Sequence, residues 1–242
     1  MALKAFFNLL LAFLVFSCSF EQENKIDYEA EFYSIVTEFE ESSILDFDRE
    51  DIDNNIFIEQ FILKLDKQKN IFVQEDLNKF KQSVNNQSAL NYQLLKDVVD
   101  LYYIRYEESL KIRRQYLNDF EFNFNKTEGI DLKPRASFFL NINDVQDHQR
   151  KIIKNELIDL ILEDKNTIEA KKELKKTYQN RFSSISKIRE SDKFGILANN
   201  FLSMLDPHAS YFSKRDLENW NLRMNLSFEG IGAILSFEEE KA

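Results

Sequence analysis

The sequence predicts a mainly α-helical fold, in which an irregular domain of several helices is followed by a short β segment near the C-terminus. The 242 residues include only four glycines and two prolines, whereas an all-β fold needs a turn signal every ~8–12 residues. Hydrophobic residues make up 43% of the chain and include 23 Phe and 9 Tyr, which is enough to fill a core. Because these side chains recur mostly with the helical period, the sequence favours helices joined by polar loops.

The charge and the composition of the chain argue against several classes of binding site. The net charge is −10 and the isoelectric point is about 4.9, whereas a nucleic-acid surface needs clustered basic residues. A single cysteine allows neither an intrachain disulfide nor a cysteine-based zinc site. The acidic stretch 46–55 lacks the glycine and the closing glutamate of a calcium loop. We therefore expect no nucleic-acid partner, no metal and no cofactor.

The N-terminus predicts export. Residues 1–17 carry one positive charge, at Lys4, before an apolar stretch that is shorter than the ~20 residues of a membrane-spanning helix and fits a signal peptide. Cys18 follows directly and resembles the acylated cysteine of bacterial lipoproteins, although Phe16 stands where a small residue is usual. Acyl chains on Cys18 would tether the chain to a membrane. Cleavage near Ser19 as an ordinary signal peptide, and an uncleaved anchor, are the alternatives.

The first half of the exported chain predicts four helices. Residues 21–41 form an acidic amphipathic helix, and Asn55 can cap a second helix that runs to residue 65. A shorter helix covers 73–80, and the longest periodic run covers 94–117. That long helix carries a stripe of tyrosines, which is more typical of the edge of a core than of a binding surface, because tyrosine buries its ring and keeps its hydroxyl in water.

The middle of the chain departs from this pattern and then returns to it. Residues 119–143 break the helical period with a glycine and a proline, so we expect an extended excursion with room for a strand pair. Helices resume at 147–162 and at 167–188. His148 has no neighbour at metal-ligand spacing except Asp144, and we expect it to be solvated.

The last stretch changes from helical to β periodicity. Ser191 is the predicted cap of a helix that stops at the Asp206-Pro207 pair, because proline lacks an amide donor. Ser213 and Asp216 have the spacing of an N-cap and its third helical residue. The short helix that follows has an apolar face of Leu217, Trp220 and Met224. After residue 225 the period becomes two, which predicts a strand.

This order of features, DPHASYFS, a capped helix and MNLSFEGIGAIL, resembles the tail-specific (C-terminal processing) proteases where their helical N-terminal domain enters the PDZ domain. The Tyr/Arg-rich stretch YYIRYEESLKIRRQYLNDFEF is similar to a helix of the larger, Gram-negative type of that family. The resemblance implies a signal peptide of lipoprotein type over 1–17, a linker over 18–27, the helical domain over 28–224 and the first strands of an incomplete PDZ domain over 225–242.

The resemblance also bears on catalysis. The family uses a serine nucleophile and a lysine base in a core that follows the PDZ domain, so we expect this chain to lack that core and to be inactive alone. No catalytic residue is assigned, and His208 is expected to have a structural role at the domain junction. PDZ domains hold a peptide carboxylate on the amides of a glycine-containing loop. The corresponding candidate loop here is Phe228, Glu229, Gly230, Ile231 and Gly232.

Two functions follow as alternatives from different classes. The first is the non-catalytic helical part of a protease of the bacterial cell envelope, periplasmic and tethered by lipid, with protein substrates or a separate PDZ–protease fragment as partners. The second is a stand-alone helical lipoprotein that acts as a protein-binding scaffold. A split gene, a gene fragment and a functional separate protein remain open on the sequence alone.

Overall fold

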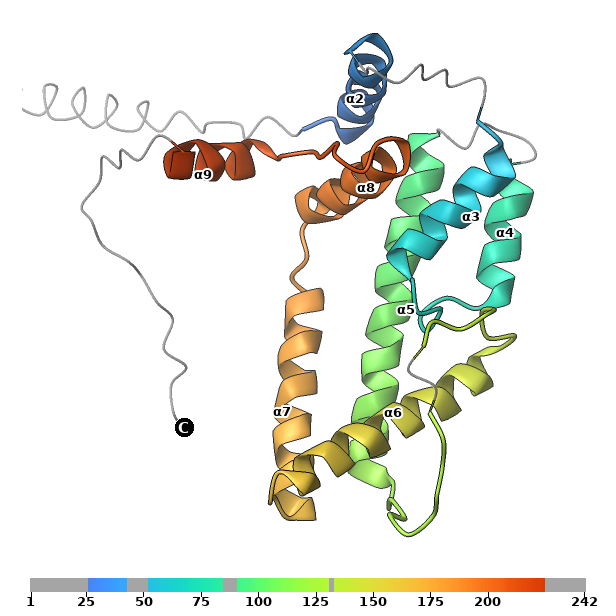
Figure 1. The fold of residues 1–242 in the computed structure, drawn as a ribbon, viewed down its shortest axis with the longest axis vertical. Helices are drawn as coiled ribbons and strands as arrows, with labels where there is room; N and C mark the ends of the chain where they lie inside the picture. The colour runs from blue at the N-terminus through green and yellow to red at the C-terminus, as the bar shows by residue number, and fades with distance from the viewer. Residues whose placement is uncertain (1–25, 43–51, 85–90, 131–132, 225–242) are drawn as a thin grey trace, which may run out of the picture.

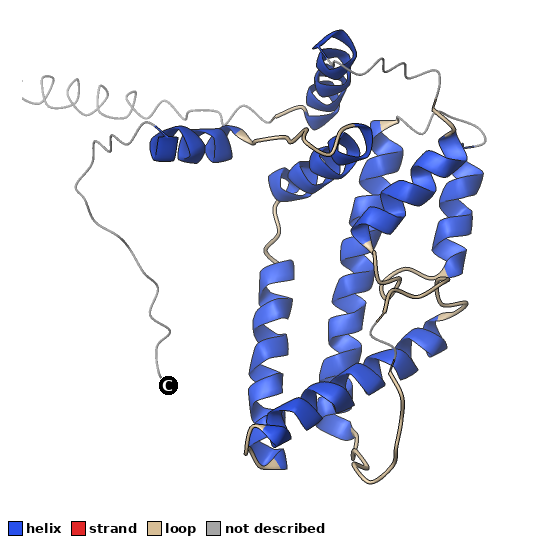
Figure 2. Cartoon of the chain, in the orientation of Figure 1, coloured by secondary structure: helices blue, strands red, loops and turns tan. Residues whose placement is uncertain are grey.

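The computed structural model describes residues 26–42, 52–84, 91–130 and 133–224, and over these ranges it contains eight helices (Figures 1 and 2). They are α2 (Tyr28–Ser42), α3 (Asn54–Leu65), α4 (Gln74–Val84), α5 (Tyr92–Asp119), α6 (Ile142–Leu162), α7 (Thr167–Ile185), α8 (Glu190–Leu205) and α9 (Lys214–Met224). The predicted mainly α-helical class is confirmed. The predicted β segment from residue 225 lies outside the described ranges.

α5 is the central element of the bundle. It contacts α2, α3, α4, α6, α7 and α8, and Figure 1 shows it running the length of the molecule. Its 28 residues correspond to about 42 Å at a rise of ~1.5 Å per residue, which is longer than one small core. The helix begins where the Asn91 side chain accepts a hydrogen bond from the Leu94 amide, 2.9 Å away.

Two separate apolar cores form along α5. The first surrounds its N-terminal half and includes Phe32, Phe57, Phe61, Phe72, Tyr92, Phe194 and Phe201. The second surrounds its C-terminal half and consists of Leu110, Leu117, Phe122, Ile153, Leu157, Ala170, Leu174 and Tyr178. Tyr103 is buried in the first core, while Tyr102 and Tyr106 pack against the two cores from the side. The tyrosine stripe therefore lies at the edge of the cores, as predicted.

Polar side chains of α5 fix the neighbouring helices along its length. Arg105 donates to both carboxylate oxygens of Asp76 on α4, at 2.9 and 3.2 Å, and Asp76 also accepts from the Val73 amide at 3.0 Å. Further along, Arg113 donates to the Gln149 side chain on α6 and to the Tyr178 hydroxyl on α7 at 3.1 Å. These hydrogen bonds set the axial position of α4, α6 and α7 against α5, which apolar packing leaves less defined.

The starts of α3, α6 and α8 are among the helix boundaries that differ from the prediction. The cap of α3 is Asp53, whose carboxylate accepts from the amides of residues 55 and 56 at 2.9 Å each, so Asn55 lies inside the helix. Ser191 likewise lies inside α8, where Asp192 accepts from the Arg189 amide at 3.1 Å. α6 begins at residue 142, earlier than predicted, because Asn141 accepts from the Asp144 amide at 3.1 Å. Near each predicted cap, several neighbouring polar residues can also cap the N-terminus of a helix, so the sequence does not decide which one does.

The predicted excursion between α5 and α6 is a loop that folds back over α6. Its described residues form no strand pair, and its single bridge joins Phe139 in parallel to Val73. Glu128 accepts two hydrogen bonds from Arg150 on α6, at 2.8 and 3.1 Å, and one from Lys154 at 2.9 Å. Arg150 and then Lys154 lower the pKa of Glu128 to about 2. These ion pairs hold the loop closed in place of sheet hydrogen bonds.

No helix in the part of the chain that the structure describes is long and apolar enough to cross a membrane.

Asp76→Ala should lower the free energy of unfolding by about 2–3 kcal/mol, because it leaves the Val73 amide without its acceptor and the partly buried Arg105 guanidinium with Glu108 alone. Glu107→Ala is the matched control, since it removes an ion pair on the same helix whose lysine, Lys111, is largely exposed. We expect that control to cost less than about 1 kcal/mol in urea unfolding. Equal losses in the two variants would contradict the role of Asp76.

Candidate functional site

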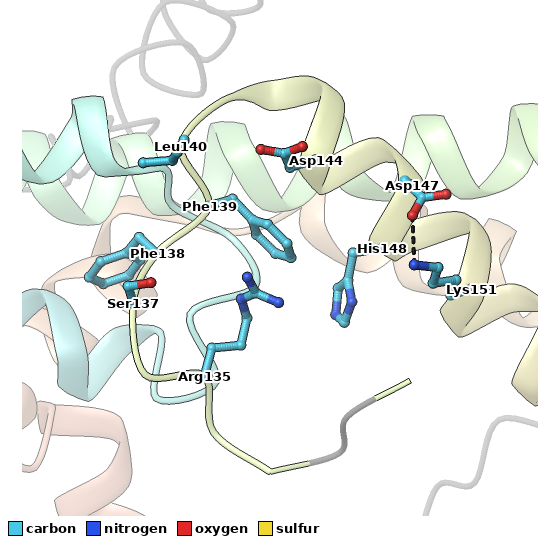
Figure 3. A pocket seen from close by; sticks show the side chains of 9 residues that line it. All are labelled: Arg135, Ser137, Phe138, Phe139, Leu140, Asp144, Asp147, His148 and Lys151. Atoms are coloured by element: carbon cyan, nitrogen blue, oxygen red, sulfur yellow. Dashed lines mark ion pairs between the residues drawn. The ribbon is translucent and has the colours of Figure 1, made fainter. Parts of the chain in front are cut away.

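A pocket opens between the loop that precedes α6 and the first turns of that helix (Figure 3). Its volume is about 420 Å³, which lies within the ~300–1,000 Å³ of small-ligand sites. Arg135, Phe139 and Leu140 line it from the loop, and Asp144, Asp147, His148 and Lys151 line it from α6. The pocket exists because the end of the loop is folded back onto the helix that follows it, so two neighbouring parts of the sequence supply its two walls.

Arg135 projects into this pocket over an aromatic ring. The centre of its guanidinium lies 3.6 Å from the centroid of Phe139, a cation–π arrangement. Its Nε is buried and has no hydrogen-bond partner. Among the charged side chains that line the pocket, Arg135 is the cation without an ion pair to any described residue, because Lys151 pairs with Asp147 at 2.8 Å.

His148 lies beside Arg135 and corrects the prediction of a solvated histidine. Its side chain packs at 5.2 Å from the Phe139 ring, the residue is 9% exposed, and its Nε2 has no hydrogen-bond partner. Burial, followed by the charges of Arg135, Arg113 and Lys151, lowers the pKa of His148 to about 4. The imidazole is therefore neutral at neutral pH.

The signal for this burial was present in the sequence. Once α6 begins at residue 142, His148 falls three residues after Val145, at helical spacing from a residue that is buried. The predicted start at residue 147 removed the first turns of the helix and hid this pattern. No local sequence pattern predicts that Arg135 lines the pocket, because the loop contacts α6 only in the tertiary structure.

Two acidic side chains complete the electrostatics of the pocket. Asp147 accepts from Arg150 at 2.9 Å and from Lys151, and these cations lower its pKa. Asp144 accepts from the Asn141 side chain at 3.0 Å. Both carboxylates thus bind neighbours on α6 or its cap, while Arg135 has donors that no carboxylate of the pocket accepts. The arrangement can therefore bind an anionic group.

The segment between α8 and α9 is a second candidate region. The Asp206 carboxylate accepts from the His208 amide at 2.8 Å and lies 3.1 Å from Nδ1 of the same residue, and the amide contact lowers the pKa of Asp206. The His208 side chain is 93% exposed. This geometry is a turn at the end of a helix, in agreement with the structural role predicted for His208.

Tyr211 fixes this segment to the bundle. Its backbone amide donates to the Asn199 side chain at 2.8 Å, and the Asn199 amide group donates back to the Tyr211 carbonyl at 3.2 Å. The Tyr211 hydroxyl donates to Glu31 on α2 at 2.7 Å, and its ring lies 5.3 Å from that of Phe194 on α8. The chain therefore leaves the bundle toward α9 from a defined position.

α9 begins with the predicted cap, because the Ser213 hydroxyl donates to the Asp216 carboxylate at 2.6 Å and accepts from the Asp216 amide at 3.2 Å. The predicted apolar face is present but uncovered. Leu217 and Trp220 are each 47% exposed, Met224 is 61% exposed, and α9 has no buried residue. Large apolar side chains gathered on one exposed helix face are typical of an interaction surface.

Other predicted sites are not reached by the structure. Cys18 and the candidate carboxylate loop from Phe228 to Gly232 lie outside the described residues. Within the described ranges, no three His, Cys, Asp or Glu side chains are placed to hold a metal ion.

His148 should make the stability of the domain depend on pH. A base whose pKa falls from 6.5 to about 4 on folding binds fewer protons in the folded state, so stability is full above pH 6.5 and is lost as pH falls toward 4. We expect about 2 kcal/mol less stability at pH 5 than at pH 7.5, measured by urea unfolding. His148→Gln should remove most of that difference, whereas His208→Gln should retain it. A wild-type pH dependence unchanged by His148→Gln would refute the assignment.

Comparison with known proteins identifies the family of this chain. The model of the tail specific protease N-terminal domain family matches residues 35–215, which include the long α5 helix and the Tyr211 segment. A tail-specific protease of Haemophilus influenzae is 30% identical over 202 residues, an alignment that covers 79% of this chain and 28% of the relative. The chain thus spans little more than a quarter of the length of that relative. On these grounds, this chain belongs to the tail-specific protease family and carries its N-terminal domain.

Proposed function

We propose that this chain is the non-catalytic, helical N-terminal portion of a tail-specific protease that degrades or processes exported proteins from their C-termini. The observation that carries the proposal is the family match over residues 35–215, which is specific to the N-terminal domain. In this role the domain packs against the PDZ and protease parts and helps to position protein substrates. Hydrolysis belongs to those parts, and the chain alone is inactive.

α9 supplies the contact with the PDZ part. It is the last described helix, and residues 225–237 follow it directly with the β periodicity of a PDZ entrance. Its exposed Leu217, Trp220 and Met224 form an apolar face that a neighbouring domain can cover. Covering such side chains is favourable at ~25 cal/mol per Å² of apolar surface removed from water. The Tyr211 contacts support this role, because they hold the start of the segment against α2 and α8.

Leu217→Ala combined with Trp220→Ala should weaken binding of the remaining protease chain at least ~10-fold, because buried aromatic residues contribute most to such contacts. The partner is the Haemophilus influenzae relative expressed without the region that aligns with this chain, and binding is measured by calorimetry. Leu162→Ala combined with Ile168→Ala is the matched control. Those two apolar side chains are also exposed but lie at the junction of α6 and α7. We expect the control to change affinity less than ~2-fold.

The relative's own aligned region serves as the positive control in that experiment. If it binds the remaining chain and the present protein does not, the protease assignment fails and the scaffold alternative gains support. The same samples test catalysis, since the present chain alone should not hydrolyse an unstructured protein with an apolar C-terminus. Hydrolysis that survives further purification would contradict a non-catalytic role.

We also propose export to the bacterial cell envelope, with a lipid anchor at Cys18 on the periplasmic side. The support is the apolar stretch up to Phe16 and the position of the single cysteine directly after it. In cells given a radiolabelled fatty acid, the wild-type chain should carry label and partition with membranes. Cys18→Ser should lose the label and most of the membrane association. Label retained by Cys18→Ser would contradict acylation at this residue, and Ser19→Ala is the matched control that should keep it.

A further inference from the structure

Two side chains that line the same pocket, Arg135 and His148, each have a buried nitrogen atom without a hydrogen-bond partner. Nε of Arg135 and Nε2 of His148 are buried and lack hydrogen bonds, and both side chains line the cavity in front of α6 (Figure 3). His148 is more than nine-tenths buried. Buried polar groups in native proteins are nearly always hydrogen-bonded, so unpaired atoms gathered at one cavity point to a missing partner.

The electrostatic environment indicates that the missing partner is an anion. Arg135 faces His148 from the loop, Arg113 from α5 and Lys151 from α6, and all three oppose its protonation, while Asp147 favours it. Arg113 is engaged with Gln149 and Tyr178, and Lys151 with Asp147. Arg135 is left with its charge uncompensated by any described carboxylate. A negative group beside Arg135 would offset that charge and accept a hydrogen bond from either side chain.

The charge of the site favours a carboxylate over a phosphate. A guanidinium offers a planar fork that pairs with two oxygens of either group, and the Arg135 guanidinium lies over the Phe139 ring at 3.6 Å. Asp144 and Asp147 line the same cavity, so a group with two negative charges meets more repulsion than a group with one. Leu140 at the rim is 75% exposed and offers apolar surface to whatever carries the carboxylate.

We propose that this cavity binds a carboxylate group, which accepts hydrogen bonds from the Arg135 guanidinium and from the imidazole of His148. This site differs from the candidate loop at Phe228 to Gly232, and it does not depend on the role proposed for α9. The carboxylate can come from a chain terminus or from an acidic side chain. Both sources share the chemistry that Arg135 and His148 recognise.

Binding is coupled to protonation of His148. The bound carboxylate adds a negative charge beside an imidazole that now faces mainly cations, so it raises the pKa of His148 from its depressed value. At a pH between the pKa of His148 in the free protein and its pKa in the complex, binding of the carboxylate is therefore accompanied by uptake of a proton. Affinity rises as pH falls from 7.5 toward 5.5, provided that the ligand stays ionised.

The test uses the full chain labelled with ¹⁵N and follows its imidazole resonances by NMR. The chain has two histidines, so exposed His208 is an internal reference for His148. N-acetyl-leucine supplies an α-carboxylate, N-acetyl-glutamic acid α-amide supplies a side-chain carboxylate, and N-acetyl-leucinamide is the neutral control. We expect saturable shifts at His148 with at least one carboxylate and none with the amide. The ratio of the two affinities identifies the source.

Substitutions of single residues test which side chains contact the carboxylate. Arg135→Gln should weaken carboxylate binding at least ~10-fold. Arg114→Gln should change it less than ~2-fold, since Arg114 is also stacked on a phenylalanine, Phe182, but lies outside the cavity. His148→Gln keeps a donor without a titrating ring, so it should bind with little change between pH 7.5 and pH 5.5. The wild type should bind at least ~5-fold more tightly at the lower pH.

Several results would overturn the proposal. One is an equal response of His148 to N-acetyl-leucine and to its amide, and another is tighter binding of inorganic phosphate than of either carboxylate. Arg135→Gln binding with wild-type affinity while folded, as judged by circular dichroism, would also reject it. The comparison of acid with amide on the wild-type chain needs no variant, so it decides the proposal even if Arg135→Gln is unstable.

Discussion

The fold depends on α5 serving two cores at once. A helix of 28 residues is longer than a single small core can cover, and its two halves are buried by different partners. Between them, Arg105 reaches the buried Asp76 and Arg113 reaches the buried Gln149. Hydrophobic burial has little directional preference, so these charge-assisted hydrogen bonds define how far each neighbour is displaced along the α5 axis. The positions of the α5–α6 loop and of the pocket beside it depend on where these helices lie along α5.

The parts of the fold that sequence predicted well are those set by local spacing. The helical class, the tyrosine stripe at the core edge and the Ser213 cap follow from side chains within one or two turns of each other. The prediction of a solvated His148 was wrong because the predicted start of α6 at residue 147 hid its helical spacing from Val145. The ion pairs of Glu128 that close the loop between α5 and α6 join residues more than 20 positions apart in sequence. Arg135 was missed because its position depends on the closing of this loop, which no local pattern in the sequence indicates. The exposed face of α9 was predicted as apolar, but its lack of cover is a property of the tertiary structure.

The two candidate regions lie on different elements and use different chemistry. The pocket combines a loop with α6 and presents unpaired polar donors, whereas α9 presents apolar side chains beyond the end of α8 (Figures 1 and 3). A change at one need not disturb the other, because no residue lines the pocket and also belongs to α9. The contact proposed for α9 and the binding proposed for the pocket can therefore be tested independently of each other.

Tyr211 also determines how the domain would respond to tension. It joins Glu31 on α2 and Asn199 on α8, and the Tyr28 ring stacks on Phe194 at 4.7 Å beside it. The first described helix, α2, is therefore linked directly to α8 and to the segment that leads into α9, and these elements lie at the same end of the bundle in Figure 1. A force that pulled the start of α2 against the end of α9 would pass through these few contacts. The core around the far half of α5 would carry almost none of the load.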